Sequence, residues 1–269
     1  MVINYDKKVS VRNRQNKIFK ADMNFFVSTK ADRSLERLTC VGSNSEARKL
    51  SLADACSSAG GFSTMNMCVF AQYLAGGYTL TIPAEAAGVA SVTVIGGGGG
   101  MGMKDHSHWN GYGGGGGGAA NKRMLLEAGA TYKIEVGPGR VTSTSGWSNS
   151  RNLGPGGTSQ FIDNDTGTVI MSATGGRSGR ETSSVSNVVA MGGVGSGGDV
   201  NCTGGTGRNG KYFEGQGESG QCLGGSGGAG GTGGGASIYG GEGGSGKCGA
   251  GGGRFHGQNG ADGCIIIEW

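Results

Sequence analysis

The side chains best suited to metal chemistry are two histidines and an aspartate in one short segment. Asp105, His106 and His108 lie within residues 103–112, and the third histidine of the chain, His256, is far away in sequence. Histidine and aspartate are common metal ligands, and side chains at i and i+2 of an extended segment share a face. A two-histidine site is therefore an open alternative, but we predict no metal and no cofactor.

Signals for catalysis are weak. Matches to G-x-G-x-x-G are unavoidable in a glycine-rich chain, and the G-x-S-x-G match around Ser226 lies inside a glycine repeat, where no strand-to-helix elbow is plausible. The chain has no Walker lysine and no H-E-x-x-H. Its carboxylates are scattered, so glycoside hydrolysis lacks a visible acid pair, although distant loops could supply one. We predict a protein that is not an enzyme.

Aromatic and polar residues are gathered in segments between glycine tracts, at 103–112, 140–151, 177–191, 208–223, 236–239 and 254–258. Loops of Tyr, Trp, Ser, Gly and Asn on a stiff scaffold combine rigid contact area with adaptable hydrogen bonding, as antibody paratopes do. An alternative is that the aromatic rings cap the glycine tracts. The candidate receptor-binding residues are His106, His108, Trp109, Tyr112, Trp147, Tyr212, Phe213, Tyr239, Phe255 and His256.

These segments must be positioned by an unusual scaffold. Residues 1–75 contain 3 glycines and residues 76–269 contain 60 of the 63 in the chain. Collagen needs a strict triplet and abundant proline, and this chain has 3 prolines. Within 224–235, Gly-Gly-X is repeated three times. A period of three fits polyglycine II, the glycine form of the three-residue left-handed screw, whose backbone groups can bond laterally to neighbouring strands.

Segments with strand character frame the tracts. Residues 78–82 alternate and end at Pro83, as an edge strand does, and 89–95 run directly into five glycines. Residues 131–136, 168–173 and 264–269 complete the set. A disordered linker, the alternative, would have no reason to carry them. We predict a β-framed polyglycine II helix sandwich with little α-helix over 76–269.

The first 75 residues are predicted to be a small α+β attachment module. Ser43-x-x-Glu46 is a capping box and Gly60-Gly61 a stop signal, which predicts a helix over about 44–59. Residues 16–29 suggest a strand pair, and 65–75 a second helix or a buried strand. Residues 1–50 carry a net charge of +6. This segment suits an acidic partner or is a solvated arm, and we predict no nucleic-acid partner.

The seven cysteines have irregular spacing without C-x-x-C. No apolar signal core is present near the N-terminus and no apolar run is long enough to span a membrane. We therefore expect the thiols to be mainly reduced and to act as small apolar fillers.

The succession of these segments resembles the glycine-rich domains of phage tail fibre proteins, above all the distal receptor-binding adhesins of T-even-like phages. The resemblance rests on residues 78–100, 131–139, 156–161, 197–207 and 257–269, ending in Ile-Ile-Glu-Trp. It implies a polyglycine II sandwich whose loops recognise a receptor. Residues 1–75 match no adhesin attachment module that we can identify.

The resemblance implies a tail fibre adhesin of the virion that is assembled in the host cytoplasm and placed at the distal end of the fibre. Its partners would be a tail fibre or tail tip protein, through residues 1–75, and a host outer-membrane protein or surface glycan, through the loops. Two alternatives stay open: a structural glycine-rich fibre segment without receptor contact, and a polysaccharide depolymerase. A polyglycine II ice-binding protein fits less well, because ice binders need a flat face without bulky loops.

Overall fold

The computed structural model describes residues 9–12, 18–21, 45–64, 66–100, 102–103, 110–140, 154–179, 190–207, 209–211, 248–251 and 259–269. The chain forms two compact units, Met1–Arg48 and Lys49–Trp269. In the first unit, β1 (Val9–Arg12) pairs with β2 (Ile18–Ala21) in an antiparallel hairpin, and β2 lies within the segment expected to hold a strand pair. No helix of the described residues is long and apolar enough to cross a membrane.

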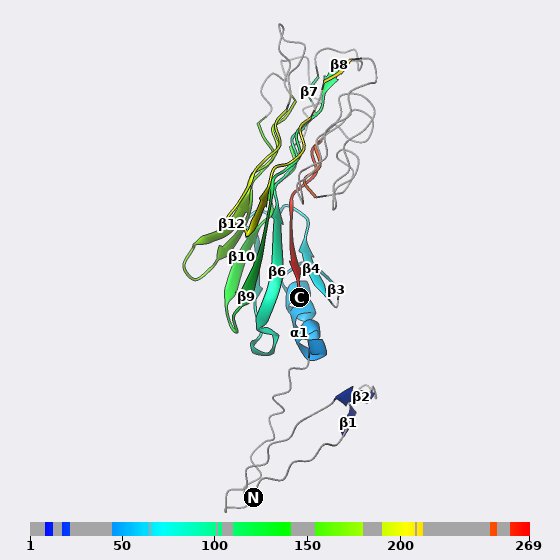
Figure 1. Cartoon of the computed structure of the whole chain (residues 1–269), viewed down its shortest axis with the longest axis vertical. Coiled ribbons are helices and arrows are strands. Elements are labelled where there is room, and N and C mark those ends of the chain that lie inside the picture. Colours follow the sequence, from blue (N-terminus) through cyan, green and yellow to red (C-terminus); the bar gives the residue numbers. More distant parts are fainter. Residues whose placement is uncertain are drawn as a thin grey trace, which may run out of the picture. The chain divides into compact units, whose positions relative to one another are not determined.

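The second unit is built mainly from two antiparallel sheets (Figure 1). The smaller sheet has the strand order β13-β12-β11-β10-β5. Its members are β5 (Tyr78–Thr81), β10 (Thr131–Glu135), β11 (Ser159–Asp163), β12 (Val169–Ala173) and β13 (Gly195–Ser196). The strand before Pro83, β5, lies at the edge of this sheet, which confirms the prediction made from its sequence.

The larger sheet has the order β14-β9-β6-β16-β4-β3. Its members are β3 (Phe62–Thr64), β4 (Met67–Phe70), β6 (Gly88–Ile95), β9 (Ala119–Leu126), β14 (Val200–Cys202) and β16 (Cys264–Glu268). Since β4 pairs with β16, where Phe70 opposes Ile265, the start of the unit is joined to the end of the chain. Residues 65–75 therefore supply a strand of this sheet rather than a helix.

The boundary between the two units differs from the one expected from the sequence. We expected the glycine-rich domain to begin at residue 76, whereas the structure divides the chain after Arg48. Because β3 and β4 hydrogen-bond into the larger sheet, they are part of the same unit as the glycine tracts. The structure thus places residues 49–75 in the same compact unit as the glycine tracts.

The apolar core lies between the two sheets. Strand alternation places one set of side chains of each strand on the inner face. Buried residues of the smaller sheet (Leu80, Ile134, Phe161 and Met171) join those of the larger sheet (Phe70, Val92, Val94, Leu126, Ile265 and Ile267) in one cluster. Tyr132 and Phe161 stack within it, with ring centroids 4.7 Å apart. This core fixes the direction in which every strand leaves the sandwich.

The helix α1 (Ser45–Ser58) confirms the helix predicted over 44–59. Gly60 has φ +89°, and the amides of Gly60 and Gly61 donate to Ser57 O and Cys56 O. This pattern is a Schellman C-cap, in which a left-handed glycine ends the helix. Leu52 and Cys56 are the buried side chains through which α1 joins the core.

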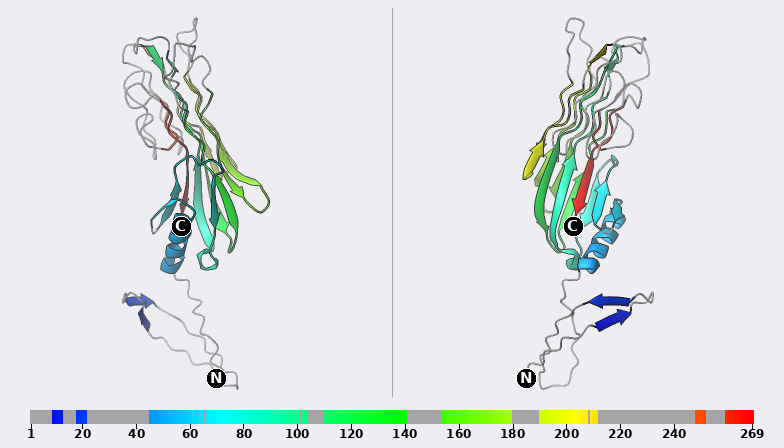
Figure 2. Two further views of the ribbon diagram at one scale, coloured as in Figure 1. Left: turned by 180° about the vertical axis from the view of Figure 1, so that it is seen from behind. Right: turned by 45° about the vertical axis from the view of Figure 1, so that its right-hand side comes forward.

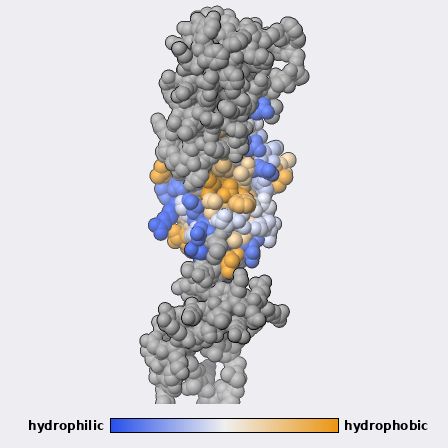
Figure 3. Space-filling view, turned by 90° about the vertical axis from the view of Figure 1, so that its right-hand side faces the viewer, coloured by the Kyte–Doolittle hydropathy of each residue, from blue (hydrophilic) through white to orange (hydrophobic). Residues whose placement is uncertain are grey.

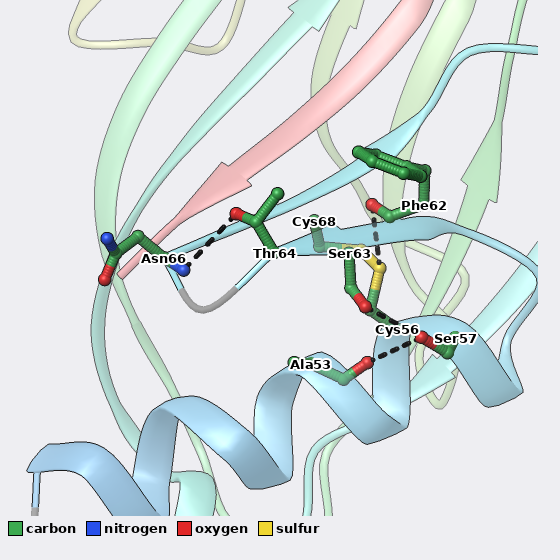
Figure 4. The surroundings of a disulfide bond; sticks show 8 residues. All are labelled: Ala53, Cys56, Ser57, Phe62, Ser63, Thr64, Asn66 and Cys68. Carbon is green, nitrogen blue, oxygen red and sulfur yellow. Dashed lines mark hydrogen bonds between the residues drawn. A yellow bond between two sulfur atoms is a disulfide. The ribbon is translucent and has the colours of Figure 1, made fainter.

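The five cysteines among the described residues are disulfide-bonded, contrary to our expectation of mainly reduced thiols. Cys56 of α1 is disulfide-bonded to Cys68 of β4, with the Cα atoms 5.8 Å apart (Figure 4). Cys248 is bonded to Cys264 of β16, and Cys202 also forms a disulfide. Cys56 and Cys68 are 12 residues apart, and only the tight turn at Gly60-Gly61 and the β3–β4 hairpin bring them together. Spacing along the chain does not reveal such a pairing.

The face of the unit that carries β3 and β4 has a central group of apolar residues bordered by hydrophilic ones (Figure 3). Large apolar side chains exposed on or directly after these strands are Phe62, Tyr73 and Leu74. Phe62 opposes Val69, which in turn opposes Ile266 in the centre of the sheet. The outer face of the larger sheet is therefore apolar in part.

Candidate functional site

The strands of the sandwich continue at one end into glycine-rich segments (Figure 2). Strand β6 runs into Gly96–Gly100, and the chain returns through 113–118 into β9. The connections from β10 to β11, from β12 to β13 and from β14 to β16 follow the same order. In each, a strand leads into a glycine tract, a longer segment that we call an excursion follows, and a second tract leads into the next strand. Because neighbouring strands are antiparallel, all these tracts leave the same end of the sandwich.

Backbone hydrogen bonds between the tracts repeat every three residues. The amides of Gly96 and Gly99 donate to one neighbouring tract, while those of Gly97 and Gly98 donate to two others. The acceptors are Gly118 O, Gly115 O, Gly157 O and Ala261 O, at 3.0, 2.8, 2.9 and 2.8 Å respectively. In a β-strand, backbone groups point to two sides only, so bonds in three directions show that the tracts are not ordinary strands.

The tract 113–118 repeats this pattern. The amides of Gly115 and Gly118 both donate to the segment that follows β12, and those of Gly116 and Gly117 donate to two other segments. The acceptors are Arg177 O, Thr174 O, Gly205 O and Gly249 O, at 2.8, 3.0, 2.8 and 2.8 Å. Both inner tracts are thus bonded laterally on three sides.

The tracts approach one another so closely that side chains are excluded. A Cβ atom added to Gly98 would lie within 3.0 Å of the backbone of Ala250, and one added to Gly117 within 3.0 Å of the backbone of Gly96. By contrast, a Cβ atom at Gly154 would meet nothing within 4 Å. The interior of this region can therefore offer only backbone groups, which are already bonded to one another.

Two buried serine hydroxyls tie tracts together. Ser159, at the start of β11, donates to Ile95 O at 2.7 Å and accepts from Gly137 N–H at 2.9 Å. Ser178 donates to Gly154 O at 2.8 Å and accepts from Gly100 N–H at 3.1 Å. Ser159 lies where the strands pass into the tracts, and Ser178 lies at the far end of the tracts.

A carboxylate just before β16 performs a similar role, because it bonds to the segments that follow β10 and β4. Asp262 accepts from Gly139 N–H at 2.7 Å through Oδ1 and from Tyr73 N–H at 3.0 Å through Oδ2. Burial, with the negative charge of Asp262 as a second cause, raises the pKa of Tyr78 above its ordinary value. Among the described residues, no group of three or more His, Cys, Asp or Glu side chains could hold a metal ion.

The predicted binding segments are excursions from these tracts. Each is bounded by described residues that lie at the ends of tracts away from the sheets, such as Gly100, Arg140, Gly154, Gly179 and Gly207. These ends are adjacent in several cases: Gly179 N–H donates to Gly100 O, and Gly207 exchanges two bonds with Ala190. Segments that are far apart in sequence thus start from one end of the scaffold.

A three-stranded sheet with the order β15-β8-β7 joins two of these segments. It consists of β7 (Gly102–Met103), β8 (Asn110–Tyr112) and β15 (Asn209–Lys211). Tyr112 opposes Gly102 on one side and Asn209 on the other. Residues 110–112 and 209–211 of the two predicted loops are therefore neighbours, which their separation of about 100 residues does not reveal.

Of the ten candidate receptor-binding residues, the structure places the backbone of Tyr112, in β8. The other nine, His106, His108, Trp109, Trp147, Tyr212, Phe213, Tyr239, Phe255 and His256, lie outside the described residues. Ser159, Ser178 and Asp262 were not predicted from the sequence. The feature of the sequence that could have indicated them is a single polar residue within or beside a glycine tract. A side chain fits at such a point only if it hydrogen-bonds to the backbone.

The opposite end of the unit carries α1 and the short hairpin connections. The residues around 127–130 and 164–168 join β9 to β10 and β11 to β12 there, and the 3₁₀ turn η1 (Ala84–Ala86) joins β5 to β6. Ser51 of α1 donates to Glu85 of η1 at 3.1 Å. The helix α1 therefore lies at the end of this unit opposite to the glycine tracts (Figure 1).

A family model described as a glycine-rich domain covers residues 73–269. No curated protein matches the chain.

Proposed function

This chain belongs to the family of glycine-rich domains, and on that basis we propose that it is a phage tail fibre adhesin, which binds a host cell-surface receptor through the excursions 103–112, 140–151, 177–191 and 208–223. The observation that supports the proposal most directly is the difference between the two ends of the second unit. The excursions start from one end of the scaffold, and α1 lies at the other end of the unit. A receptor-binding protein needs this separation, since one end is held and the other is presented.

The scaffold of this adhesin is a polyglycine II sandwich that extends a β-sandwich. Hydrogen bonds in three directions with a period of three, together with the exclusion of Cβ atoms, support this assignment. Each lateral bond contributes only about 0.5–1.5 kcal/mol net, so the network and the sheet framing must act together. Recognition is left to the excursions, because the scaffold itself has almost no side chains.

The chemistry of the excursions suits a protein loop or a glycan as receptor. They combine Trp109, Trp147 and Tyr212 with serine, asparagine and histidine, the mixture that gives large contacts with adaptable hydrogen bonds. The first unit and α1 hold the chain to a tail fibre or tail tip protein. The chain acts in the virion, at the distal end of the fibre.

The test is an exchange of excursions between related phages. Replacing 103–112 and 208–223 by the corresponding residues of a homologue with another host should redirect adsorption to the host of the donor, since β8–β15 pairing places the two segments together. As a matched control, the hairpin connection 164–168 at the opposite end is replaced in the same way and should leave the host unchanged. An unchanged host after both excursions are exchanged would refute the assignment.

A further inference from the structure

We propose that the outer face of the larger sheet is an interface between two copies of this chain, which pack face to face about a two-fold axis parallel to the strands. The side chains involved belong to β3, β4, β6, β9, β14 and β16, and none of them lies in an excursion. Self-association of the unit Lys49–Trp269 is separate from receptor binding, so the two proposals stand or fall independently.

Strand alternation identifies the side chains on this face. The core between the two sheets contains alternate residues of each strand, such as Val92 of β6 and Leu126 of β9, so the residues next to them point outward. Four outward apolar side chains are 46–69% exposed, namely Phe62, Val89, Leu125 and Val200. Exposed apolar side chains that share one face indicate an interaction surface, whereas single scattered ones do not.

Two opposite charges stand in one row across the same face. Glu268 of β16 opposes Ser91 of β6, and Ser91 opposes Arg123 of β9. Both charged residues are exposed. The one ion pair within the described part of the chain joins Lys133 to Glu135, so neither Arg123 nor Glu268 has an ionic partner there.

A two-fold axis that runs parallel to β6, above Ser91, would pair both charges. Rotation about this axis exchanges the strands on the two sides of β6 and keeps the position along them. Since β16 and β9 are the two neighbours of β6, Arg123 of each copy then faces Glu268 of the other. One charged pair in the sequence thus gives two ion pairs in the dimer, as a self-complementary interface requires.

The same rotation also matches apolar side chains. Val69 and Val200 lie in one row, each two strands away from β6 on opposite sides, so Val69 of one copy faces Val200 of the other. Val89, which belongs to β6 itself, faces Val89 of the second copy. Burial of these side chains would remove apolar surface that each copy alone exposes to water.

The charges also select the direction in which the copies pack. An axis that runs across the strands would set Arg123 over Arg123 and Glu268 over Glu268, and like charges in contact across an interface are strongly unfavourable. The axis along the strands is therefore favoured. Sheets that pack face to face keep their strands roughly aligned, so the glycine tracts of both copies leave the dimer in the same direction.

The size of the face sets the expected affinity. Six strands about 4.8 Å apart, with five residues each at about 3.3 Å, give a face of roughly 29 by 17 Å. The two copies together would bury roughly 1,000 Å², which is near the lower limit for a specific interface. We therefore expect a dissociation constant of micromolar order.

Sedimentation equilibrium of the full-length chain tests the interface. The wild type should be mainly dimeric at about 100 µM. Arg123→Glu or Glu268→Arg should each weaken the dimer by about tenfold or more, because symmetry places like charges at both contacts. Val200→Asp should weaken it too. All three positions are exposed, so the Tm should change little.

The decisive comparison combines the two reversals. The double variant Arg123→Glu/Glu268→Arg should dimerise within about threefold of the wild type, and so should an equimolar mixture of the two single variants, since each restores opposite charges at both contacts. Asp165→Arg is the matched control, because it makes the same change of charge on the exposed β11–β12 connection and should have no effect.

Three results would overturn the inference. The first is a wild-type chain that stays monomeric at about 100 µM. The second is association of the single variants as weak as that of the double variant or of the mixture. The third is a mixture that associates more tightly than the wild type while the single variants match the wild type, since this pattern belongs to an axis across the strands.

Discussion

At the scale of the residue, the glycines of the tracts are required where backbones touch. Gly98 and Gly154 are both glycine, but only Gly98 has a neighbouring backbone where its Cβ atom would lie. We expect Gly98→Ala to lower the free energy of unfolding by about 1–3 kcal/mol, the usual cost of overpacking, since no side chain is present to move aside. Chemical denaturation measures the change.

Gly154→Ala is the matched control for this prediction. Its Cβ atom would project into open space, and its carbonyl, which accepts the bond from Ser178, is retained. We expect a change within about 0.5 kcal/mol, as at other unobstructed surface positions. Similar losses for both variants would mean that close packing does not explain the glycine content.

The raised pKa values of two tyrosines predict how the free energy of unfolding changes at alkaline pH. Burial raises the pKa of Tyr132 in the folded chain; a backbone hydrogen bond at Glu127 opposes this rise, and the negative charges of Glu127 and Asp163 add to it. Burial is also the main cause that raises the pKa of Tyr78. Above the ordinary tyrosine pKa of about 10, the unfolded chain releases these protons first, so the free energy of unfolding should fall as pH rises through that value.

The variant Tyr132→Phe tests this dependence, because it retains the stacked ring but cannot ionise. Denaturation curves from pH 8 to 11 should show a smaller loss of stability for Tyr132→Phe than for the wild type. An unchanged dependence on pH would show that Tyr132 titrates in the folded chain as it does in the unfolded one.

At the scale of the element, the disulfide between Cys56 and Cys68 holds α1 to the sheet (Figure 4). Only Leu52 and Cys56 of the described side chains of this helix are buried, so the covalent link carries much of the attachment. Replacement of both cysteines by serine should lower the free energy of unfolding by about 2–4 kcal/mol, and α1 amides should exchange hydrogen faster than those of β6.

Reduction of the wild-type chain is the complementary measurement. A thiol reductant should increase exchange in α1 of the wild type but not of the doubly substituted chain. If α1 is equally protected in both, the helix is held by packing alone.

The elements also show what sequence can and cannot predict. Helix α1 and strands β5, β6, β10, β12 and β16 follow from capping residues, alternation and bounding prolines or glycines. Strand β9 was missed because Asn121, Lys122 and Arg123 interrupt its apolar pattern. Beyond Asn121, β9 still pairs with β6 but no longer with β14, so polar side chains are tolerated on this part of the strand.

The candidate site was predictable only in part, for a similar reason. The aromatic excursions stand out against glycine, but their proximity depends on the pairing of β8 with β15 and on hydroxyl ties such as Ser178. These contacts join segments separated by 24 to about 100 residues, and no local pattern specifies such pairs. The disulfides were missed because no local pattern in the sequence shows which cysteines pair.

At the scale of the whole molecule, the proposed function depends on the difference between the two ends of the unit Lys49–Trp269. Its apolar core and hairpin connections form a base, and its tracts carry the excursions away from that base. The scaffold has few side chains with which to bind anything, so under the proposed function variation in recognition lies in the excursions. This explains how one framework could serve different receptors without a change in its core.

The most direct test of this account is binding of the fluorescently labelled chain to host cells. The wild-type chain should bind saturably, and replacement of 103–112 and 208–223 by glycine-serine linkers of equal length should abolish binding while the Tm changes by only a few degrees. Replacement of 164–168 at the opposite end should leave binding intact. Undiminished binding after both excursions are replaced, or loss of binding after replacement of 164–168 alone, would contradict the account.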